Sequence, residues 1–247
     1  MSWEWELLLA CCLLLGSALY TTVGHAGASA YIAIMALFGV APSVMRPTAL
    51  VLNILVAAYA SWRYVGAGLF RWRTIWPVLT SAIPAAFLGG SIQLPGQYYR
   101  PLVGVVLLAA AARLLWSKEP KAVQEPVDMP VGWGLLAGCG IGLLSGLTGT
   151  GGGIFLSPLI LFAGWSDTRT ASGVAAVFIL CNSVAGLLGN LASVRSLPSD
   201  LPLLAAAALG GAVVGTMLGI SQFANTTILK ALGLVLVIAG LKMIGVY

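Results

Sequence analysis

Ten apolar runs follow one another along the 247 residues and constrain the fold more than any single motif does. Five or six of them approach the roughly 20 residues that a helix needs to cross a hydrocarbon core of ~30 Å. No run alternates polar and apolar residues as a strand would, so helices must satisfy the backbone in lipid. The runs lie at about 5–23, 28–40, 44–66, 74–92, 98–116, 131–147, 154–164, 170–192, 201–220 and 227–245. The sequence therefore predicts an all-α polytopic membrane protein.

The composition agrees, since 60% of the residues are hydrophobic and only 8% are charged, whereas about a quarter of an average soluble domain is charged. The net charge of +5 would suit a nucleic-acid partner if the basic residues formed one patch. They are scattered at expected helix ends instead, so we expect no nucleic-acid partner and a lipid bilayer around the chain.

The basic residues also predict a topology. The loop at 62–73 and the zone at 113–121 are rich in arginine and lysine, and two expected helices separate them. Both can therefore be cytoplasmic, as the positive-inside rule requires. Counting the expected membrane crossings from these two cytoplasmic zones places both chain ends outside the cytoplasm. These ends are the start, with Glu4 and Glu6, and the last residue, Tyr247. Because Glu4 and Glu6 stand where a signal peptide carries basic residues, we expect the first apolar run to be retained.

A hydrophilic stretch with three prolines, 117–130, predicts a cytoplasmic linker between two membrane repeats, 1–116 and 131–247. The halves carry similar features in the same order. Matched positions are Pro77 with Pro202, Gly90 with Gly215, Gly104 with Gly233 and Arg113 with Lys242. Since the topology gives each half an odd number of crossings, the sequence predicts a duplication whose two halves are inverted.

Each half opens with an apolar stretch that glycines interrupt, at 5–40 and 131–164. About 35 residues make roughly 50 Å of helix, too long for one span and slightly short for two spans and a turn. We therefore expect a broken or re-entrant hairpin before three transmembrane helices in each half, with pairs of short full spans as the alternative. Inverted repeats with broken helices are typical of secondary transporters.

The hairpin tips have the composition of an anion site. A glycine loop that opens a helix exposes backbone N–H groups at the positive end of the helix dipole. "TTVGHAGAS" precedes a helix expected near Ala30, and "TGTGGGIFLSP" contains one expected near Ile154. The candidate substrate-binding residues of the tips are Thr22, Gly24, His25, Gly27, Ser29, Thr148, Thr150, Gly151, Gly152 and Gly153. A preceding ladder of glycines, Gly134, Gly138, Gly142 and Gly146, predicts close helix packing instead.

No Asp or Glu lies in the middle of an expected span, which favours an anion over a cation as substrate. Asn53 and Asn182 lie at mid-depth, where each can bond a neighbouring helix or the ligand. His25, the only histidine, can couple proton and anion movement or remain neutral on backbone partners.

Arg46 and Arg169 begin corresponding helices, where they can attract anions or anchor the helix at the interface. Asp167, just before Arg169, fits an ion pair or a helix cap. The four cysteines, Cys11, Cys12, Cys139 and Cys181, have no metal-type spacing, and we expect buried thiols. No lysine follows the glycines and no strand precedes them, so nucleotide loops do not fit. We expect no cofactor and no metal.

The sequence resembles the TauE/SafE sulfite-exporter family of bacterial membrane proteins over nearly its whole length. The resemblance is carried by "GLLSGLTGTGGGIFLSPLILFAGW" at 142–165 and, more weakly, by "VGHAGASAYIAIMALFGVAPSVMRPTALVLN" at 23–53, which lacks consecutive glycines. It implies export of sulfite, or transport of organosulfonates and related sulfur oxyanions, across the cytoplasmic membrane.

Three other functions compete with an anion carrier. An anion channel would use the same tips, a membrane serine protease would pair Ser145 with His25, and a structural subunit would move no anion. The sequence leaves open the anion, the direction, the coupling ion and the oligomeric state, a homo-oligomer included.

Overall fold

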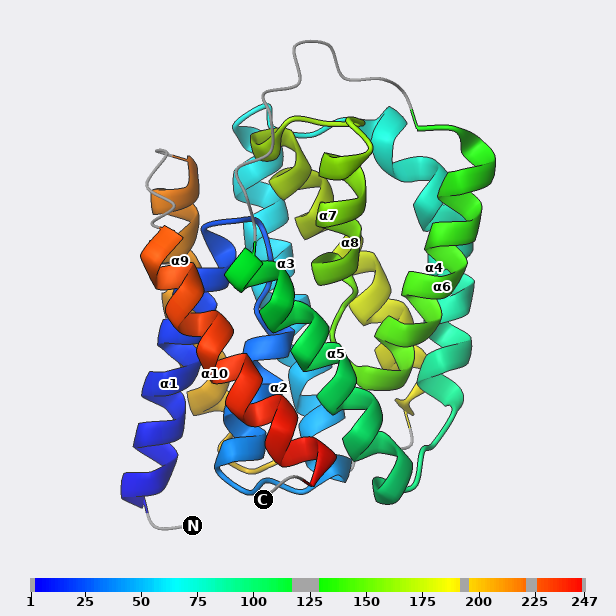
Figure 1. Ribbon diagram of the computed structural model, residues 1–247. Coiled ribbons are helices and arrows are strands. Elements are labelled where there is room, and N and C mark those ends of the chain that lie inside the picture. The colour runs from blue at the N-terminus through cyan, green and yellow to red at the C-terminus, as the bar shows by residue number, and fades with distance from the viewer. Residues whose placement is uncertain (1–2, 117–128, 192–195, 221–225, 246–247) are drawn as a thin grey trace.

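The computed structural model describes residues 3–116, 129–191, 196–220 and 226–245, and within them the regular elements are ten α-helices (Figure 1). They are α1 (Trp3–Thr21), α2 (Ala28–Leu37), α3 (Pro42–Gly66), α4 (Trp72–Ser91), α5 (Gly96–Trp116), α6 (Val131–Thr148), α7 (Gly153–Phe162), α8 (Thr168–Gly189), α9 (Leu201–Ile220) and α10 (Thr226–Ile244). Six of them, α1, α3, α5, α6, α8 and α9, are long and apolar enough to cross a membrane. The predictions of an all-α fold and of a multi-pass membrane protein are confirmed. The expected linker at 117–130 lies outside the described residues except for Met129 and Pro130.

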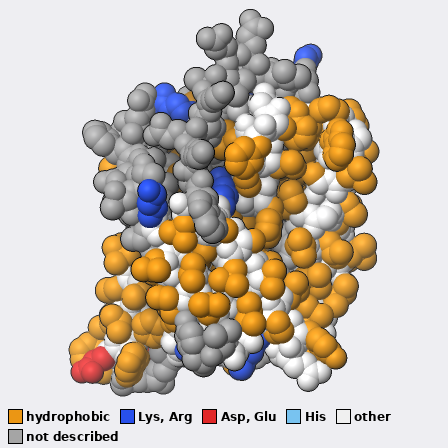
Figure 2. All heavy atoms as spheres, viewed as in Figure 1, with side chains coloured by type: hydrophobic (Ala, Val, Ile, Leu, Met, Phe, Trp, Pro, Cys, Tyr) orange, Lys and Arg blue, Asp and Glu red, His pale blue; other side chains and the backbone are white. Residues whose placement is uncertain are grey.

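The face of the molecule in Figure 2 is covered largely by hydrophobic side chains, as expected of a surface in contact with lipid. Two of the cysteines contribute to the outer surface, because Cys11 and Cys139 are exposed and only Cys12 and Cys181 are partly buried. The prediction of four buried thiols is therefore wrong. An apolar run does not distinguish a side chain that faces lipid from one that faces the protein, since both environments are apolar.

Each half begins with one long and one short helix. The long arms α1 and α6 have 19 and 18 residues, and the short arms α2 and α7 have 10 each, or about 15 Å of helix. The short arms cannot span a hydrocarbon core, so pairs of full spans are not formed. In Figure 1, α1 enters from the end of the molecule where both chain termini lie, whereas α6 enters from the opposite end.

Glycines allow the long helices to approach closely. The ladder on α6 packs against α4, and a Cβ at Gly142 or Gly146 would clash with the backbone oxygen of Ala82 or Ala86. This confirms the packing role predicted for the ladder. A second ladder, which the sequence reasoning missed, packs α9 against α1. There, Gly211 and Gly215 meet the backbone oxygens of Leu14 and Ala18.

Candidate functional site

Two hairpin tips, at 22–27 and 149–152, connect the long arms to the short arms. The N-cap of each short helix is a glycine in the left-handed conformation. It is Gly27, with φ 98°, for α2 and Gly152, with φ 77°, for α7. Neither cap has a side chain that could accept from the first N–H groups, and no side-chain cap bond is formed. The start of each short helix therefore keeps backbone donors for another partner.

The starts of α2 and α7 line one small cavity, which we call the central cavity. Its volume is about 10 Å³, close to the space that one water molecule needs. The lining residues come from both halves, and none of them is acidic. They are Tyr20, His25, Ala26, Gly27, Ala28, Ser29, Asn53, Thr150, Ile154 and Ile179. Five predicted site residues, His25, Gly27, Ser29, Asn53 and Thr150, thus meet around one space.

His25 joins the first tip to the first turns of α7. Its side chain is buried, and Nε2 lies 3.0 Å from both the Gly153 carbonyl oxygen and the Ser157 hydroxyl. Arg113 Nη1 lies 3.3 Å from the same nitrogen. Because a carbonyl only accepts and a guanidinium only donates, Nε2 satisfies one or the other according to the tautomer. The Nδ1 atom is buried and has no hydrogen-bond partner among the described residues.

Arg113 is the residue of this region that the sequence reasoning missed as a site residue. The sequence placed it among the topology signals of the zone 113–121, whereas its side chain is directed to His25 from the last turn of α5. One signal could have found it: Arg113 lies inside the apolar run 98–116, where a charged side chain is costly and usually functional.

The two mid-depth asparagines lie beside the glycines of the second tip. Asn53 donates from Nδ2 to the Ser183 hydroxyl over 3.3 Å, while its Oδ1 atom has no partner in the described chain. Asn182 is fully buried, and neither polar atom of its amide has a described partner. A Cβ at Gly151 would lie 2.6 Å from Asn53 Nδ2, and one at Gly152 would lie 3.3 Å from Asn182 Nδ2. Both amides therefore keep hydrogen-bonding capacity at the tip.

Other predicted site residues have local roles. Thr22 donates to the Leu19 carbonyl, and Gly24 packs against the backbone of Ser172 on α8. Neither lines the central cavity. Thr148 shares a hydrogen bond of 2.9 Å with the hydroxyl of Thr150, which does line it.

The serine predicted as a nucleophile does not meet the histidine. Ser145 Oγ is buried and has no hydrogen-bond partner among the described residues. His25 contacts Ser157 instead. The geometry of a Ser145–His25 pair is therefore not formed.

Arg46 and Arg169 both bind helix C-termini. Only 6% of Arg46 is exposed. Its guanidinium donates to the four carbonyl oxygens of Gly89, Gly90, Ile92 and Gly146. Four carbonyl oxygens therefore provide partners within the protein for the Arg46 guanidinium, and its predicted roles as an interfacial anchor or an attractor of anions stay predictions. Arg169 donates to the carbonyl of Ile220, the last residue of α9, and its N–H is in turn bonded to Asp167. Asp167 is the N-cap of α8, as one of its two interpretations predicts.

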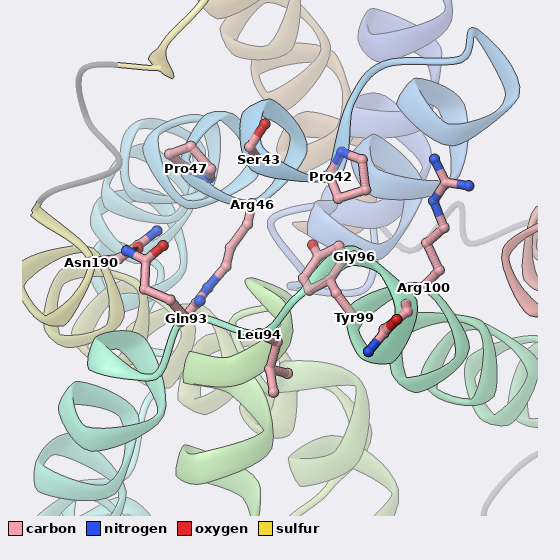
Figure 3. A pocket seen from close by; sticks show the side chains of 11 residues that line it. Pro42, Ser43, Arg46, Pro47, Gln93, Leu94, Gly96, Tyr99, Arg100 and Asn190 are labelled. Atoms are coloured by element: carbon pink, nitrogen blue, oxygen red, sulfur yellow. Dashed lines mark hydrogen bonds between the residues drawn. The ribbon is translucent and has the colours of Figure 1, made fainter.

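A larger cavity, which we call the vestibule, lies at the start of α3 and α5 (Figure 3). Its volume is about 530 Å³. Figure 3 shows Arg46 and Arg100 on either side of Tyr99 in this view. The lining residues are Pro42, Ser43, Arg46, Pro47, Gln93, Leu94, Gly96, Gln97, Tyr99, Arg100 and Asn190.

Comparisons with known proteins agree with a membrane-spanning fold. The family model described as the sulfite exporter TauE/SafE matches residues 8–243. The probable membrane transporter protein y4hK of Sinorhizobium fredii (strain NBRC 101917 / NGR234) is 38% identical over 228 residues, which cover 91% of this chain and 92% of that protein. The chain therefore belongs to the TauE/SafE family and is a multi-pass membrane transporter.

Proposed function

We propose that this transporter exports sulfite, or a related sulfur oxyanion or organosulfonate, across the bacterial cytoplasmic membrane and holds the anion between the two tips. The observation that carries this proposal is that the starts of α2 and α7, from opposite halves, line the same cavity. Each helix N-terminus is equivalent to roughly half a positive charge. Two of them directed at one space, with no acidic lining residue, favour an anion.

The donors around the central cavity suit a compact oxyanion. The Tyr20 hydroxyl, which accepts from the Ser29 hydroxyl, lines it, as do the neutral Thr150 hydroxyl and Asn53 amide. The Asn182 amide lies against the second tip, and Arg113 adds a full positive charge beside His25. Neutral donors bind an oxyanion without holding it as tightly as several buried cations would. Such a site allows the release that a carrier requires.

The size of the central cavity supports a carrier over an open pore. A sulfur oxyanion has at least four heavy atoms, so it needs more room than one water molecule. The tips must therefore separate before the anion enters, and they close again around it or behind it. We propose alternating access in which a tip moves relative to the long helices that pack against it.

We further propose that the halves are inverted repeats. The first tip packs through Gly24 on Ser172, near the start of α8, and the second packs through Gly149 on Arg46, near the start of α3. Arg46 binds the C-terminal end of α4, as Arg169 binds that of α9. Each tip thus rests on a helix of the other half. This exchange supports a duplication with the predicted topology, in which both chain ends lie outside the cytoplasm.

The test of the proposed function is sulfite efflux from loaded proteoliposomes, with Gly151→Ala compared with Gly164→Ala. Both glycines have φ near +70°, so both substitutions carry the same backbone strain. A Cβ at Gly164 meets nothing within 4 Å, whereas one at Gly151 lies 2.6 Å from Asn53 Nδ2. We expect Gly164→Ala to retain efflux and Gly151→Ala to reduce it about tenfold or more, as expected for a lost hydrogen bond to a charged ligand.

Two results would reject the proposal. If the wild-type chain moves no sulfur oxyanion, the assigned substrate class is wrong. If Gly151→Ala and Gly164→Ala are equally active, the anion does not bind at the second tip. Flux that never saturates with sulfite would favour the channel.

A further inference from the structure

The vestibule has the size of a ligand site and is distinct from the central cavity. Its volume of about 530 Å³ falls within the range of small-molecule pockets, roughly 300–1,000 Å³. It is built where α3 and α5 begin, next to the connection between α4 and α5. It is large enough for an oxyanion with an organic substituent, which the central cavity in its closed form is not.

The charged groups of the vestibule are all cationic. Arg46 and Arg100 line it, and none of the eleven lining residues is acidic. Only 6% of Arg46 is exposed, and its Nε atom is buried and has no hydrogen-bond partner in the described chain. Arg100 is exposed to the hollow and to solvent. Two guanidinium groups in one concave space attract anions and raise their local concentration.

The start of α5 adds backbone donors. The N–H groups of Tyr98 and Tyr99 both donate to the Pro95 carbonyl, which leaves those of Gly96 and Gln97 as the first donors of the helix without an intrahelical acceptor. Both residues line the vestibule, and a Cβ at Gly96 would meet nothing within 4 Å. An anion can therefore approach this helix end without steric hindrance.

The second tip contacts residues that line the vestibule and contributes a residue to the central cavity. Tyr99, which lines the vestibule, donates to the Thr148 carbonyl over 3.0 Å. Arg46 packs against Gly149 from the same side. Two residues from Thr148, Thr150 lines the central cavity. A ligand in the vestibule is thus separated by one short loop from the proposed transport site.

We infer that the vestibule is a second oxyanion-binding site, in which Arg100 and the N–H groups at the start of α5 hold a sulfur oxyanion or a sulfonate group. This inference rests on the proposed function, because it makes the vestibule a station on the path of the same anion. Arg46, whose Nη atoms are bound to carbonyls, contributes positive potential. Anions enter or leave the vestibule at the end of the molecule that carries both chain termini.

The first experiment measures sulfite binding to the purified full-length chain by titration calorimetry. We expect two classes of site in the wild type. Arg100→Gln should weaken one class about tenfold, as expected for a lost charge-assisted bond, and leave the other unchanged. The matched control is Arg73→Gln, an exposed arginine in the first turn of α4 at the opposite end, which should weaken neither class.

A second pair of variants isolates the backbone donor. Gln97→Pro removes the N–H at a position where helices tolerate proline, whereas Gln97→Ala removes only the side chain. The vestibule class should be weaker in Gln97→Pro than in Gln97→Ala. Equal binding in this pair, together with unchanged binding in Arg100→Gln, would overturn the inference.

Transport separates a failure of this inference from a failure of the proposed function. The assay uses vesicles of defined orientation. When sulfite is supplied on the side of the membrane that carries both chain termini, Arg100→Gln should raise the half-saturating sulfite concentration about tenfold. When sulfite is supplied on the other side, this concentration should not change. Transport by the wild type with no change in Arg100→Gln from either side would reject the vestibule and keep the central site. Two binding classes without any transport by the wild type would instead reject the proposed function.

Discussion

A guanidinium among membrane-spanning helices is costly unless its charge is balanced. Arg113 lies in the last turn of α5 and contacts His25, which lines the central cavity. The acidic residues of the described chain lie at or beside helix starts, as Glu4, Glu6, Asp167 and Asp200. The proposed anion is therefore a suitable partner for this charge. The His25 imidazole lies directly beside this charge.

His25 is expected to couple anion and proton movement. A proton on His25 adds positive charge beside the anion, and it changes the contacts of Nε2 with Gly153, Ser157 and Arg113. In sulfite-loaded proteoliposomes, we expect a pH gradient to change the wild-type efflux rate. We expect no such response in His25→Ala or in His25→Gln, whose amide can retain one hydrogen bond without titrating.

Efflux that ignores both the gradient and the substitutions would reject proton coupling through His25. A gradient response that persists in His25→Gln would assign the coupling to another group.

At the scale of one element, α8 shows how a helix start supports the region around the tips. Asp167 Oδ1 accepts from the N–H groups of Arg169 and Thr170, each over 3.0 Å. Arg169 in turn binds the end of α9, and Gly24 of the first tip packs on Ser172 of the same helix. The cap therefore fixes the beginning of a helix on which the first tip rests.

Removal of this cap should cost stability without removing a donor from the central cavity. We expect Asp167→Ala to lower the free energy of unfolding by about 1 kcal/mol and Asp167→Asn by only a few tenths, since asparagine caps helices about as well as aspartate. Thermal unfolding in detergent measures the difference. Equal losses in Asp167→Ala and Asp167→Asn would show that the charge, and not the cap, stabilises α8.

The pH dependence of the cap follows from the pKa of Asp167. Partial burial, the largest single influence, raises the pKa of this carboxyl, but hydrogen bonds from Thr170 and Arg169 lower it below the ordinary value of 3.8. A lowered pKa in the folded state stabilises the protein above the unfolded pKa, and the effect is lost as the pH falls through the folded pKa. The contribution of the ionised cap should therefore be constant at neutral pH and disappear only below about pH 4.

At the scale of the whole molecule, the arrangement of the two hairpins indicates which contacts must separate in the proposed alternating-access cycle. The hairpins enter from opposite ends of the bundle, and the first tip meets the start of α7 at His25 and Gly153. The second tip contacts Tyr99 and Arg46 of the vestibule and lines the central cavity through Thr150. Separation of the second tip from Arg46 and Tyr99 would connect the two cavities. Separation of the first tip from α8 would open the opposite side.

This motion predicts a pattern of thiol labelling in a background in which the four native cysteines are replaced. Thr150→Cys, at a residue only 5% exposed, should react with an impermeant reagent from either side of the membrane, faster when sulfite turns over. Gln97→Cys, in the vestibule, should react from one side alone. Labelling of Thr150→Cys from both sides at a rate that sulfite does not change would favour a channel.

The sequence by itself determined that the chain lies in a lipid bilayer and that it forms helices. The reason is that 60% of its residues are hydrophobic and form runs of about 20 residues, and in lipid such runs satisfy their backbone hydrogen bonds as helices. It also located both tips to within about two residues of where the short helices begin, because positive-φ glycines break a helix through purely local energetics. The close packing of the Gly134–Gly146 ladder followed from spacing alone for the same reason: it depends on one helix face.

Only the tertiary structure decided which side chains share a space. Arg113 and His25 are 88 residues apart, and Arg46 reaches a carbonyl 100 residues away. Whether Cys11 faces lipid, or Thr22 turns back to its own helix, depends on helix rotation, which packing between helices sets. Lipid and protein interior are both apolar, so hydropathy carries no information about that rotation. Hence the sequence identified the tips, and the fold determined their partners and placed the vestibule beside them.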